Sequence, residues 1–380
     1  MRSVREQVLL SGFTTLGLGG PAQRFVEAGT DQEIIAEVRA ADERGEPLLV
    51  LGGGSNLVIA DDGFPGTVIR VATKGIRRVP AKADGGGPGA PVALTVAAGE
   101  EWDAVVASCV AAELAGLECL SGIPGLAGAT PIQNVGAYGQ EVAETITTVS
   151  AYDRARCEVV ELAAGDCGFG YRTSAFKRSI AAPAVTGRFV VLGVTFRLTA
   201  DRFSRPVRYT ELATSLGVDE GGSAPLGDVR AAVLGLRRSK GMVLDAGDPD
   251  SRSAGSFFTN PVLDTARFAA LRRAVALRCG PDVRIPQFPA EPGHVKVSAA
   301  WLIAQAGFRK GHEGTASSPD DGRPGAGRAR ISAKHTLALV NPGGASAAAV
   351  ASLAREIRDR VRDVFGVELA HEPVLVGVSL

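Results

Sequence analysis

The segment Gly122-Ile-Pro-Gly-Leu-Ala-Gly-Ala-Thr-Pro-Ile-Gln-Asn-Val-Gly-Ala-Tyr-Gly139 decides how this chain is interpreted. It holds five glycines and two prolines in eighteen residues and carries no charged side chain. Its Ile, Leu and Val residues argue against a flexible linker. Glycine leaves backbone N–H groups uncovered, and successive N–H groups in turns form concave sites suited to phosphate oxygens. The segment therefore predicts backbone held close to a cofactor.

A second glycine-rich turn precedes it by about seventy residues. A buried strand predicted at 48–51 runs into Gly52-Gly53-Gly54-Ser55-Asn56. A glycine turn after a strand is usually only a turn, but two such segments together can hold one long phosphate-linked cofactor. The Rossmann fingerprint is absent, because Gly17-Leu-Gly19-Gly20-Pro21 follows no convincing strand. Uncharged groups at Thr130, Gln133 and Asn134 suit the edges of a flavin ring.

Composition restricts the classes of function that remain. The chain has 380 residues, 45% of them apolar, which is enough for two or three domains. Its 41 basic and 41 acidic residues cancel, so nothing indicates nucleic acid or an anionic membrane as a partner. The five cysteines are scattered, and no long apolar run or secretion signal occurs. We expect a soluble, cytoplasmic protein, with no metal site and no covalent histidyl flavin among its four scattered histidines.

Hydrophobic spacing and capping residues predict a mixed α and β chain. Thr30 and Glu33 predict the start of a helix that runs to about Gly45. Further helices are predicted at 102–114, 264–278, 298–306 and 346–365, and strands at 92–97, 146–152, 157–162, 189–198 and 336–340. The Gly/Pro-rich stretches 80–91 and 314–328 are predicted to be a flexible loop and a poorly ordered insertion.

Six ordered motifs resemble the UDP-N-acetylenolpyruvoylglucosamine reductase family across nearly the whole chain. They are Leu51-Gly-Gly-Gly-Ser-Asn-Leu-Val58, Gly122-Ile-Pro-Gly125, Pro131-Ile-Gln-Asn-Val-Gly-Ala-Tyr-Gly139, Tyr171-Arg-Thr-Ser174, Ala254-Gly-Ser-Phe-Phe-Thr-Asn-Pro261 and Glu372-Pro-Val374. The resemblance implies an α+β protein with a two-subdomain FAD-binding fold of the vanillyl-alcohol oxidase/para-cresol methylhydroxylase type and a C-terminal α/β substrate-binding domain. The expected domains are FAD-binding subdomains at 1–75 and 76–205 and a substrate-binding domain at 206–380.

The resemblance also assigns three catalytic residues, each of which has an ordinary alternative. Arg172 could lie on a surface turn, but a guanidinium also binds a carboxylate through paired planar hydrogen bonds. Ser256 could close a turn, and no His–Asp pair is spaced to make it an acyl nucleophile. Glu372 could be a solvated carboxylate at a strand end. The resemblance implies Arg172 as the catalytic arginine, Ser256 as the proton donor and Glu372 as the third member.

The same resemblance implies the binding residues. The expected contacts to non-covalent FAD are Gly52, Gly53, Gly54, Ser55, Asn56, Gly122, Ile123, Pro124, Gly125, Thr130, Gln133, Asn134, Gly136 and Ala137. The expected contacts to a nucleotide-sugar substrate are Tyr138, Tyr209, Lys240, Asn260 and Gln305. Lys240 would meet the diphosphate, and Tyr209 marks the subtype whose tyrosine loop covers the substrate.

The implied reaction is the NADPH-dependent reduction of UDP-N-acetylglucosamine enolpyruvate to UDP-N-acetylmuramate, with NADPH as co-substrate. It belongs to peptidoglycan synthesis, and through it to cell shape and division. We expect a monomer. Two alternatives stay open: another oxidoreductase of the same FAD-binding fold, such as a sugar or alcohol oxidase, and a nucleotide-sugar-binding flavoprotein without catalysis.

Overall fold

The computed structural model describes residues 4–80, 89–181, 183–315 and 327–380. Most of the two Gly/Pro-rich stretches, predicted as a loop and an insertion, lies outside these residues, at 81–88 and 316–326. The chain forms two compact units, each with its own core. Unit 1 comprises Met1–Leu9, Pro21–Gly54 and Phe64–Val243, and unit 2 comprises Leu10–Gly20, Ser55–Gly63 and Leu244–Leu380.

The first sheet of unit 1 has four strands in the order β1-β2-β5-β3. These are β1 (Val4–Leu9), β2 (Pro21–Ala28), β5 (Phe64–Val71) and β3 (Leu48–Leu51), and β5 runs parallel to both β2 and β3. Helix α1 (Asp31–Glu43) buries Ile34 and Val38, and the Thr30 hydroxyl accepts a hydrogen bond from the Glu33 amide at 3.2 Å. The predicted helix start and the predicted strand at 48–51 are confirmed.

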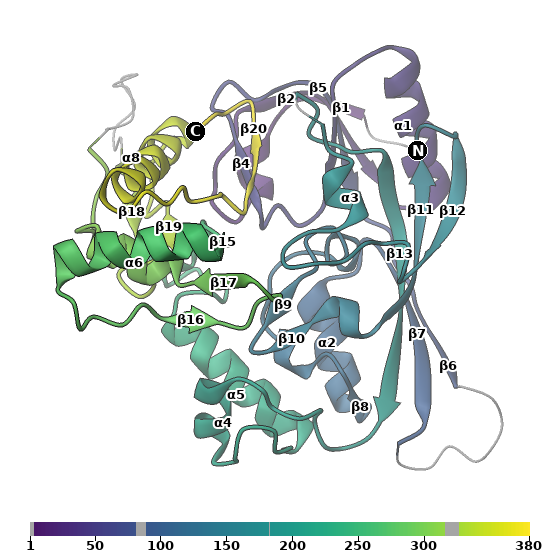
Figure 1. Ribbon diagram of the computed structural model, residues 1–380. Helices are drawn as coiled ribbons and strands as arrows, with labels where there is room; N and C mark the ends of the chain where they lie inside the picture. Colours follow the sequence, from purple (N-terminus) through teal and green to yellow (C-terminus); the bar gives the residue numbers. More distant parts are fainter. Residues whose placement is uncertain (1–3, 81–88, 182, 316–326) are drawn as a thin grey trace. The chain divides into compact units, whose positions relative to one another are not determined.

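The second sheet of unit 1 contains six strands. Its order is β12-β11-β13-β7-β6, and β8 pairs with β13 (Figure 1). The bounds are β6 (Ile76–Pro80), β7 (Pro91–Ala97), β8 (Leu114–Ala115), β11 (Ile146–Asp153), β12 (Glu158–Ala163) and β13 (Phe189–Ala200). The predicted hairpin and strands are confirmed. Helix α2 (Trp102–Ala111) is shorter than predicted, because Glu113 has a φ of +54° and Leu114 begins β8.

Among the described helices of unit 1, α4 (Thr210–Leu216) and α5 (Leu226–Ser239) were not predicted, and neither was the four-residue helix α3 (Ala175–Arg178). Helix α5 buries Leu226, Val229 and Val233, a spacing that does indicate one apolar helix face. Short elements build the connections around them: 3-10 turns at Glu118–Leu120, Ala127–Ala129 and Val142–Glu144, strands β9 (Gly136–Ala137) and β10 (Gln140–Glu141), and helix α3 (Ala175–Arg178).

In the residues that the structure describes, unit 2 combines three small sheets with three α-helices. Strands β14 (Ser253–Ser256), β19 (Ala338–Val340) and β18 (Arg330–Ile331) form one sheet. Strands β15 (Val262–Asp264), β17 (His294–Val297) and β16 (Gln287–Phe288) form another, and β4 (Leu57–Ile59) pairs in parallel with β20 (Val374–Val376). Helices α6 (Thr265–Cys279), α7 (Ala299–Gln305) and α8 (Ala347–Phe365) confirm the three predicted helices within one residue at each end.

Further 3-10 turns lie at Leu10–Phe13 and Pro249–Ser251 of unit 2. Helix α8 is the longest helix in the described residues, and it ends as predicted at Gly366, which has a φ of +67°. The helices of the described chain are all too short or too polar to be candidate membrane spans.

An ion pair between the buried Asp153 carboxylate and the exposed Arg188, at the tip of the β11–β12 hairpin, makes the stability of unit 1 depend on pH. The Asp153 carboxylate is 1% exposed and accepts hydrogen bonds from Arg188 at 2.8 and 2.5 Å. The Arg188 hydrogen bonds hold the pKa of Asp153 below its ordinary value. A lowered folded-state pKa contributes stability above the unfolded pKa of about 3.9, and that contribution is lost as the pH falls through the folded pKa.

We therefore predict that Asp153→Asn lowers the free energy of unfolding by about 1 to 3 kcal/mol at pH 7. Urea unfolding of both proteins between pH 7 and pH 3 measures this difference. The difference in free energy of unfolding between the two proteins should narrow as the pH falls below about 4, because the wild type then loses the stability that the charged Asp153 contributes. A gap that is constant over this range would contradict the role given to the Asp153 charge.

Candidate functional site

The two glycine-rich turns of unit 1 meet in the structure. A Cβ atom added to Gly53 would lie 2.7 Å from the Cα atom of Gly125, and one added to Gly52 would lie 3.9 Å from the Leu126 side chain. Contacts under 3.0 Å are not seen for real Cβ atoms, so only glycine at position 53 lets the two backbones approach this closely. The predicted association of segments about seventy residues apart is thus present in the fold.

Bare backbone is available at this meeting point. Considering only residues that the structure describes, the amide groups of Gly53, Gly54 and Ile123 donate no hydrogen bond to the protein. Gly125 has a φ of +122°, a conformation that side chains rarely permit. The side chains of Ile123 and Pro124, which belong to the second turn, are half-buried. Uncovered amides on closely packed turns are the arrangement that phosphate oxygens and flavin edges require, so the residues present fit an FAD.

This close approach predicts the effect of one added methyl group. Gly53→Ala should weaken FAD binding by about 10- to 100-fold, because the turns must separate at a cost of about 1 to 3 kcal/mol. Titration of the apoprotein with FAD, followed by flavin fluorescence, measures the change. Gly165→Ala is the matched control, since a Cβ there meets nothing within 4 Å. Equal FAD affinity in the two variants would show that the contact between the turns does not shape the cofactor site.

The polar side chains of the second segment are engaged with the protein. The Thr130 hydroxyl donates to the Ala127 carbonyl at 2.7 Å and closes a 3-10 turn. Gln133 accepts a hydrogen bond from the Lys177 ammonium at 2.9 Å. Asn134 is 1% exposed, and its side chain forms hydrogen bonds with Glu141, Gly170 and Ala143. Gly136 and Ala137 form the short strand β9 and are half-buried. These side chains give the segment a defined shape as well as polar atoms.

Arg172 lies against the same segment. It occupies a tight turn in which Gly170 and Thr173 exchange two backbone hydrogen bonds of 3.1 Å, and its φ is +53°. Its guanidinium donates to the Asn134 carbonyl at 3.3 Å and to the Gly136 carbonyl at 2.6 Å. A Cβ atom on Gly136 would lie 3.1 Å from the Arg172 Nη1 atom. The structure therefore brings the predicted arginine to the predicted cofactor segment.

Three predicted substrate residues also gather within unit 1. The rings of Tyr138 and Tyr209 meet edge to face at 5.4 Å, and the Lys240 ammonium lies 5.7 Å from the Tyr138 ring centre. Lys240 also pairs with Glu211 at 2.6 Å. Burial raises the pKa of Tyr138 to about 12, so its hydroxyl remains a hydrogen-bond donor at neutral pH. An ammonium beside two tyrosines is suited to a phosphorylated ligand.

Ser256 and Glu372 are neighbours in unit 2. Ser256 ends β14 opposite Ala338 of β19. The amide of Glu372 donates to the carbonyl of Phe257, the next residue after Ser256, at 2.8 Å. Asn56 holds the same segment, because its side chain donates to the Glu372 carbonyl at 3.3 Å. The backbone segments that carry Ser256 and Glu372 are thus adjacent. Ser55 and Asn56 belong to the same unit, whereas Gly52–Gly54 belong to unit 1.

The two remaining substrate candidates lie at opposite ends of α7. Asn260 accepts a hydrogen bond from the Ala299 amide at 3.0 Å, at the start of the helix. Gln305 is its last residue, and its side chain contacts the Cys279 thiol at 3.5 Å. A helix of seven residues is about 10 Å long, so the structure does not bring these two side chains together.

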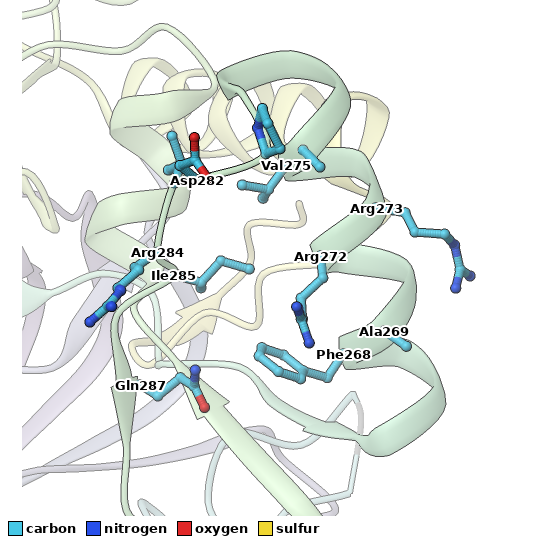
Figure 2. A pocket seen from close by; sticks show the side chains of 12 residues that line it. Phe268, Ala269, Arg272, Arg273, Val275, Asp282, Arg284, Ile285 and Gln287 are labelled. Carbon is cyan, nitrogen blue, oxygen red and sulfur yellow. The ribbon is translucent and has the colours of Figure 1, made fainter.

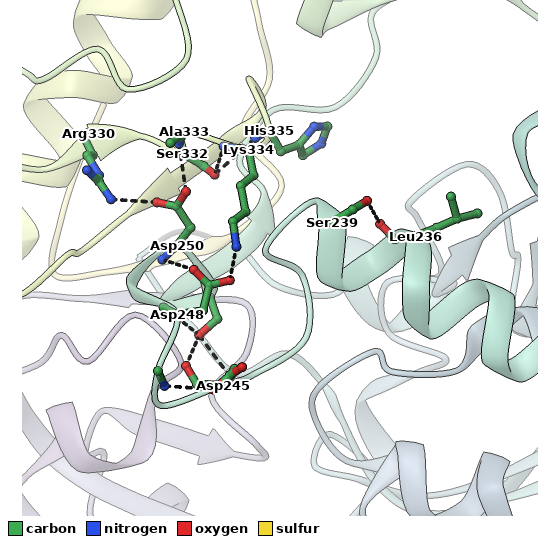
Figure 3. Close-up of polar contacts among 12 residues, drawn as sticks. Leu236, Ser239, Asp245, Asp248, Asp250, Arg330, Ser332, Ala333, Lys334 and His335 are labelled. Atoms are coloured by element: carbon green, nitrogen blue, oxygen red, sulfur yellow. Dashed lines mark hydrogen bonds and ion pairs between the residues drawn. The ribbon is translucent and has the colours of Figure 1, made fainter.

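An ionic network holds the loop that leads into β14 (Figure 3). The Asp250 carboxylate is 3% exposed and accepts hydrogen bonds from Arg330 at 2.8 Å and from the Ala333 amide at 3.0 Å. Lys334 donates to Asp248 at 2.7 Å, and this bond lowers the pKa of Asp248. The network fixes residues 248–250 to the β18–β19 connection, a few residues before Ser256.

Unit 2 also contains a cavity of about 640 Å³ between α6 and residues 281–287. Figure 2 shows Ile285 and Arg272 facing this space, while Arg273 points away from it. None of the residues predicted from the sequence lines this cavity. It is therefore separate from the chemistry assigned to Ser256 and Glu372.

Several residues at the cofactor segment were not predicted. Lys177 joins Gln133 to the Arg172 carbonyl, the latter at 3.2 Å. Asp103 accepts from the Gly122 amide at 2.6 Å and pairs with Arg230. Arg237 is 8% exposed, and burial lowers its pKa. Their sequence context carried no distinguishing signal, because each acts through a contact between distant segments.

The fold and the site define a flavoprotein with an FAD-binding domain followed by a distinct C-terminal domain. Residues 22–163 match the family model described as an FAD binding domain. Residues 248–376 match the model described as the C-terminal domain of UDP-N-acetylenolpyruvoylglucosamine reductase. The chain belongs to the UDP-N-acetylenolpyruvoylglucosamine reductase family.

Relatives of that name match along the whole chain. One from Thermobifida fusca is 52% identical over 378 residues, covering 100% of this chain and 99% of the relative. One from Streptomyces coelicolor is 54% identical and covers 98% of this chain and 90% of the relative. The crystal structure of the reductase from Thermus caldophilus is 24% identical, covers 99% and 100% of the two chains and has a TM-score of 0.58. These matches confirm the predicted family and fold class.

Proposed function

We propose that this protein reduces UDP-N-acetylglucosamine enolpyruvate to UDP-N-acetylmuramate, with NADPH as the electron donor. Family membership supports the reaction, since curated relatives with this activity in their names match nearly end to end. The observation that carries the proposal is the placement of Arg172, whose guanidinium lies on the carbonyl groups of the glycine-rich segment. A fixed cation at a flavin cradle suits a substrate that carries a carboxylate.

The glycine turns would hold the cofactor. We assign Gly52, Gly53 and Gly54 and the segment from Gly122 to Ala137 to its binding, because their backbones are uncovered and closely packed. Ser55 and Asn56 continue the first turn. When bound, FAD supplies the capacity to accept hydride from a nicotinamide and to donate it to an activated alkene.

Three residues would act on the enolpyruvyl group. Hydride addition to the terminal alkene carbon leaves negative charge on the neighbouring carbon and its carboxylate. Arg172 would stabilise that charge through paired hydrogen bonds, and Glu372 would assist as a protonated carboxylic acid, the form in which it can donate a hydrogen bond. The Ser256 hydroxyl would donate the proton that completes the reduced product. Positive charge must already be in place when the enolate forms, and the contacts of Arg172 with two carbonyls preorganise it.

The remaining predicted residues would bind the nucleotide sugar. Tyr138, Tyr209 and Lys240 form one cluster in unit 1, in which Lys240 offers an ammonium to the diphosphate. Asn260 and Gln305 would bind other parts of the substrate, consistent with their separation along α7. We further propose a cytoplasmic monomer that acts in peptidoglycan precursor synthesis, and through it in cell shape and division. The assigned subdomains are 1–75 and 76–205 for FAD and 206–380 for the substrate.

Steady-state kinetics test this function against an oxidase of the same fold. NADPH oxidation should depend on the enolpyruvyl nucleotide sugar and should form UDP-N-acetylmuramate in equal amount, detected by mass spectrometry. Oxygen consumption with sugars or alcohols, and no response to the enolpyruvyl substrate, would favour an oxidase instead. A protein that binds the nucleotide sugar without turnover would favour the non-catalytic alternative.

A further inference from the structure

Both N–H groups of the Asn134 side chain donate to protein atoms, so neither is available to a ligand. Its Nδ2 atom donates to the Glu141 carboxylate at 2.7 Å and to the Gly170 carbonyl at 3.0 Å, and its Oδ1 atom accepts from the Ala143 amide at 3.2 Å. The orientation of the amide is unambiguous. A backbone N–H can only donate, and a carboxylate or carbonyl oxygen can only accept. Asn134 is also 1% exposed.

These bonds connect the glycine-rich segment to the turn that carries Arg172. Gly170 is the first residue of that turn and bonds to Thr173 in both directions at 3.1 Å. Asn134 therefore holds the base of the turn with its side chain. Its own carbonyl accepts a hydrogen bond from the guanidinium of Arg172 at 3.3 Å. The one residue fixes both the backbone and the side chain of Arg172.

Both residues adopt an uncommon backbone conformation. The φ angles of Asn134 and Arg172 are +43° and +53°. Such conformations persist only where surrounding contacts hold them, and they concentrate at functional sites. Ser174 adds a parallel contact, since its hydroxyl donates to the Ile132 carbonyl at 2.8 Å. The Arg172 turn is thus attached to the cofactor segment at several points, with Asn134 at the centre.

We propose that Asn134 is a positioning residue for Arg172, acting through Gly170 and through its own carbonyl rather than through a side-chain contact to the cofactor. This inference rests on the proposed function, because Arg172 is assigned to the enolpyruvyl carboxylate there. Loss of the amide should release the turn and let the guanidinium move. A displacement of about 1 Å of a catalytic group can cost about 100-fold in rate.

The test uses Asn134→Ala in the full-length protein loaded with FAD. The rate of flavin reoxidation by the enolpyruvyl substrate should fall by about 10- to 100-fold, while flavin reduction by NADPH stays within about twofold of wild type. The Kd for FAD should rise by a smaller factor than the reoxidation rate falls, because the lost amide was bonded only to protein groups and acts on the cofactor solely through the shape of the segment. A large loss of FAD affinity would overturn the proposal in favour of a direct cofactor contact.

A double-mutant cycle separates positioning from general destabilisation. In an Arg172→Lys background, Asn134→Ala should cost less than about threefold, since the group that it positions is already gone. Full additivity would overturn the proposal. Asp153→Asn is the matched control: it disrupts another buried polar cluster of unit 1 and should lower stability without changing reoxidation.

Exchanging the amide of Asn134 and the carboxylate of Glu141 provides a rescue. Asn134→Asp faces the Glu141 carboxylate with a second carboxylate and should be at least as impaired as Asn134→Ala. Adding Glu141→Gln restores the hydrogen bond between positions 134 and 141 but not the one to the Gly170 carbonyl, so it should recover only part of the lost rate. If wild type reoxidises with the enolpyruvyl substrate but no Asn134 variant is slowed, the inference fails and the function stands. If wild type itself does not respond, the proposed function fails.

Discussion

Replacement of Arg172 by lysine should lower kcat for the enolpyruvyl substrate by about 100- to 1000-fold. Lysine keeps the charge but presents one ammonium in place of a planar fork. It cannot bond to the carbonyls of Asn134 and Gly136 and still offer two parallel hydrogen bonds to a carboxylate. Steady-state assays together with rapid-mixing measurement of flavin reoxidation quantify the loss.

Arg178→Lys is the control for this substitution. Arg178 is exposed in α3, six residues beyond Arg172, and its guanidinium donates to the Gly168 carbonyl at 3.0 Å. Turnover of this variant should stay within about twofold of wild type, as is usual for exposed positions. Near-normal turnover in Arg172→Lys would show that bidentate recognition is not required there.

Ser256→Ala should separate the two halves of the reaction. Flavin reduction by NADPH needs no proton from Ser256 and should be nearly unchanged. Reduction of the enolpyruvyl group should fall by about 100- to 10,000-fold, the range for loss of a positioned general acid. Stopped-flow absorbance of the flavin reports each half separately, with Ser223→Ala as a control at an exposed serine of unit 1.

The pattern of the loss matters more than its size in this variant. If flavin reduction slows as much as overall turnover, then Ser256 supports cofactor reduction or the fold rather than protonation. An unchanged rate of enolpyruvyl reduction would show that Ser256 takes no part in the chemistry. The selective loss is the expected outcome because only reduction of the enolpyruvyl group requires a proton on carbon.

Local sequence signals predicted much of the fold. Helix starts were found where a side chain caps the first turn, as at Thr30, Ser298 and Ser346, whose hydroxyls accept backbone hydrogen bonds. The β11–β12 hairpin was found because its strands are adjacent in sequence. The parallel pairing of β4 with β20 was not, since it joins residues more than three hundred positions apart. Such pairing is decided by tertiary packing, which a local pattern does not contain.

The candidate site shows the same division. Glycine content predicted that two distant turns act together, and the contact between Gly53 and Gly125 agrees with that. Residue type alone could not show that the Asn134 amide is fully bonded to the protein, or that Lys177 links Gln133 to Arg172. A polar side chain in a motif can bind a ligand or hold the motif in shape. Only the contacts of the side chain in the structure show which of these two roles it has.

Anaerobic two-step reduction tests the central claim most directly. The purified protein should be yellow, and its flavin absorbance should disappear on addition of NADPH. Addition of the enolpyruvyl nucleotide sugar, still without oxygen, should restore the absorbance as UDP-N-acetylmuramate forms. Flavin that stays reduced after the enolpyruvyl substrate is added, or a protein that binds no FAD, would contradict the account.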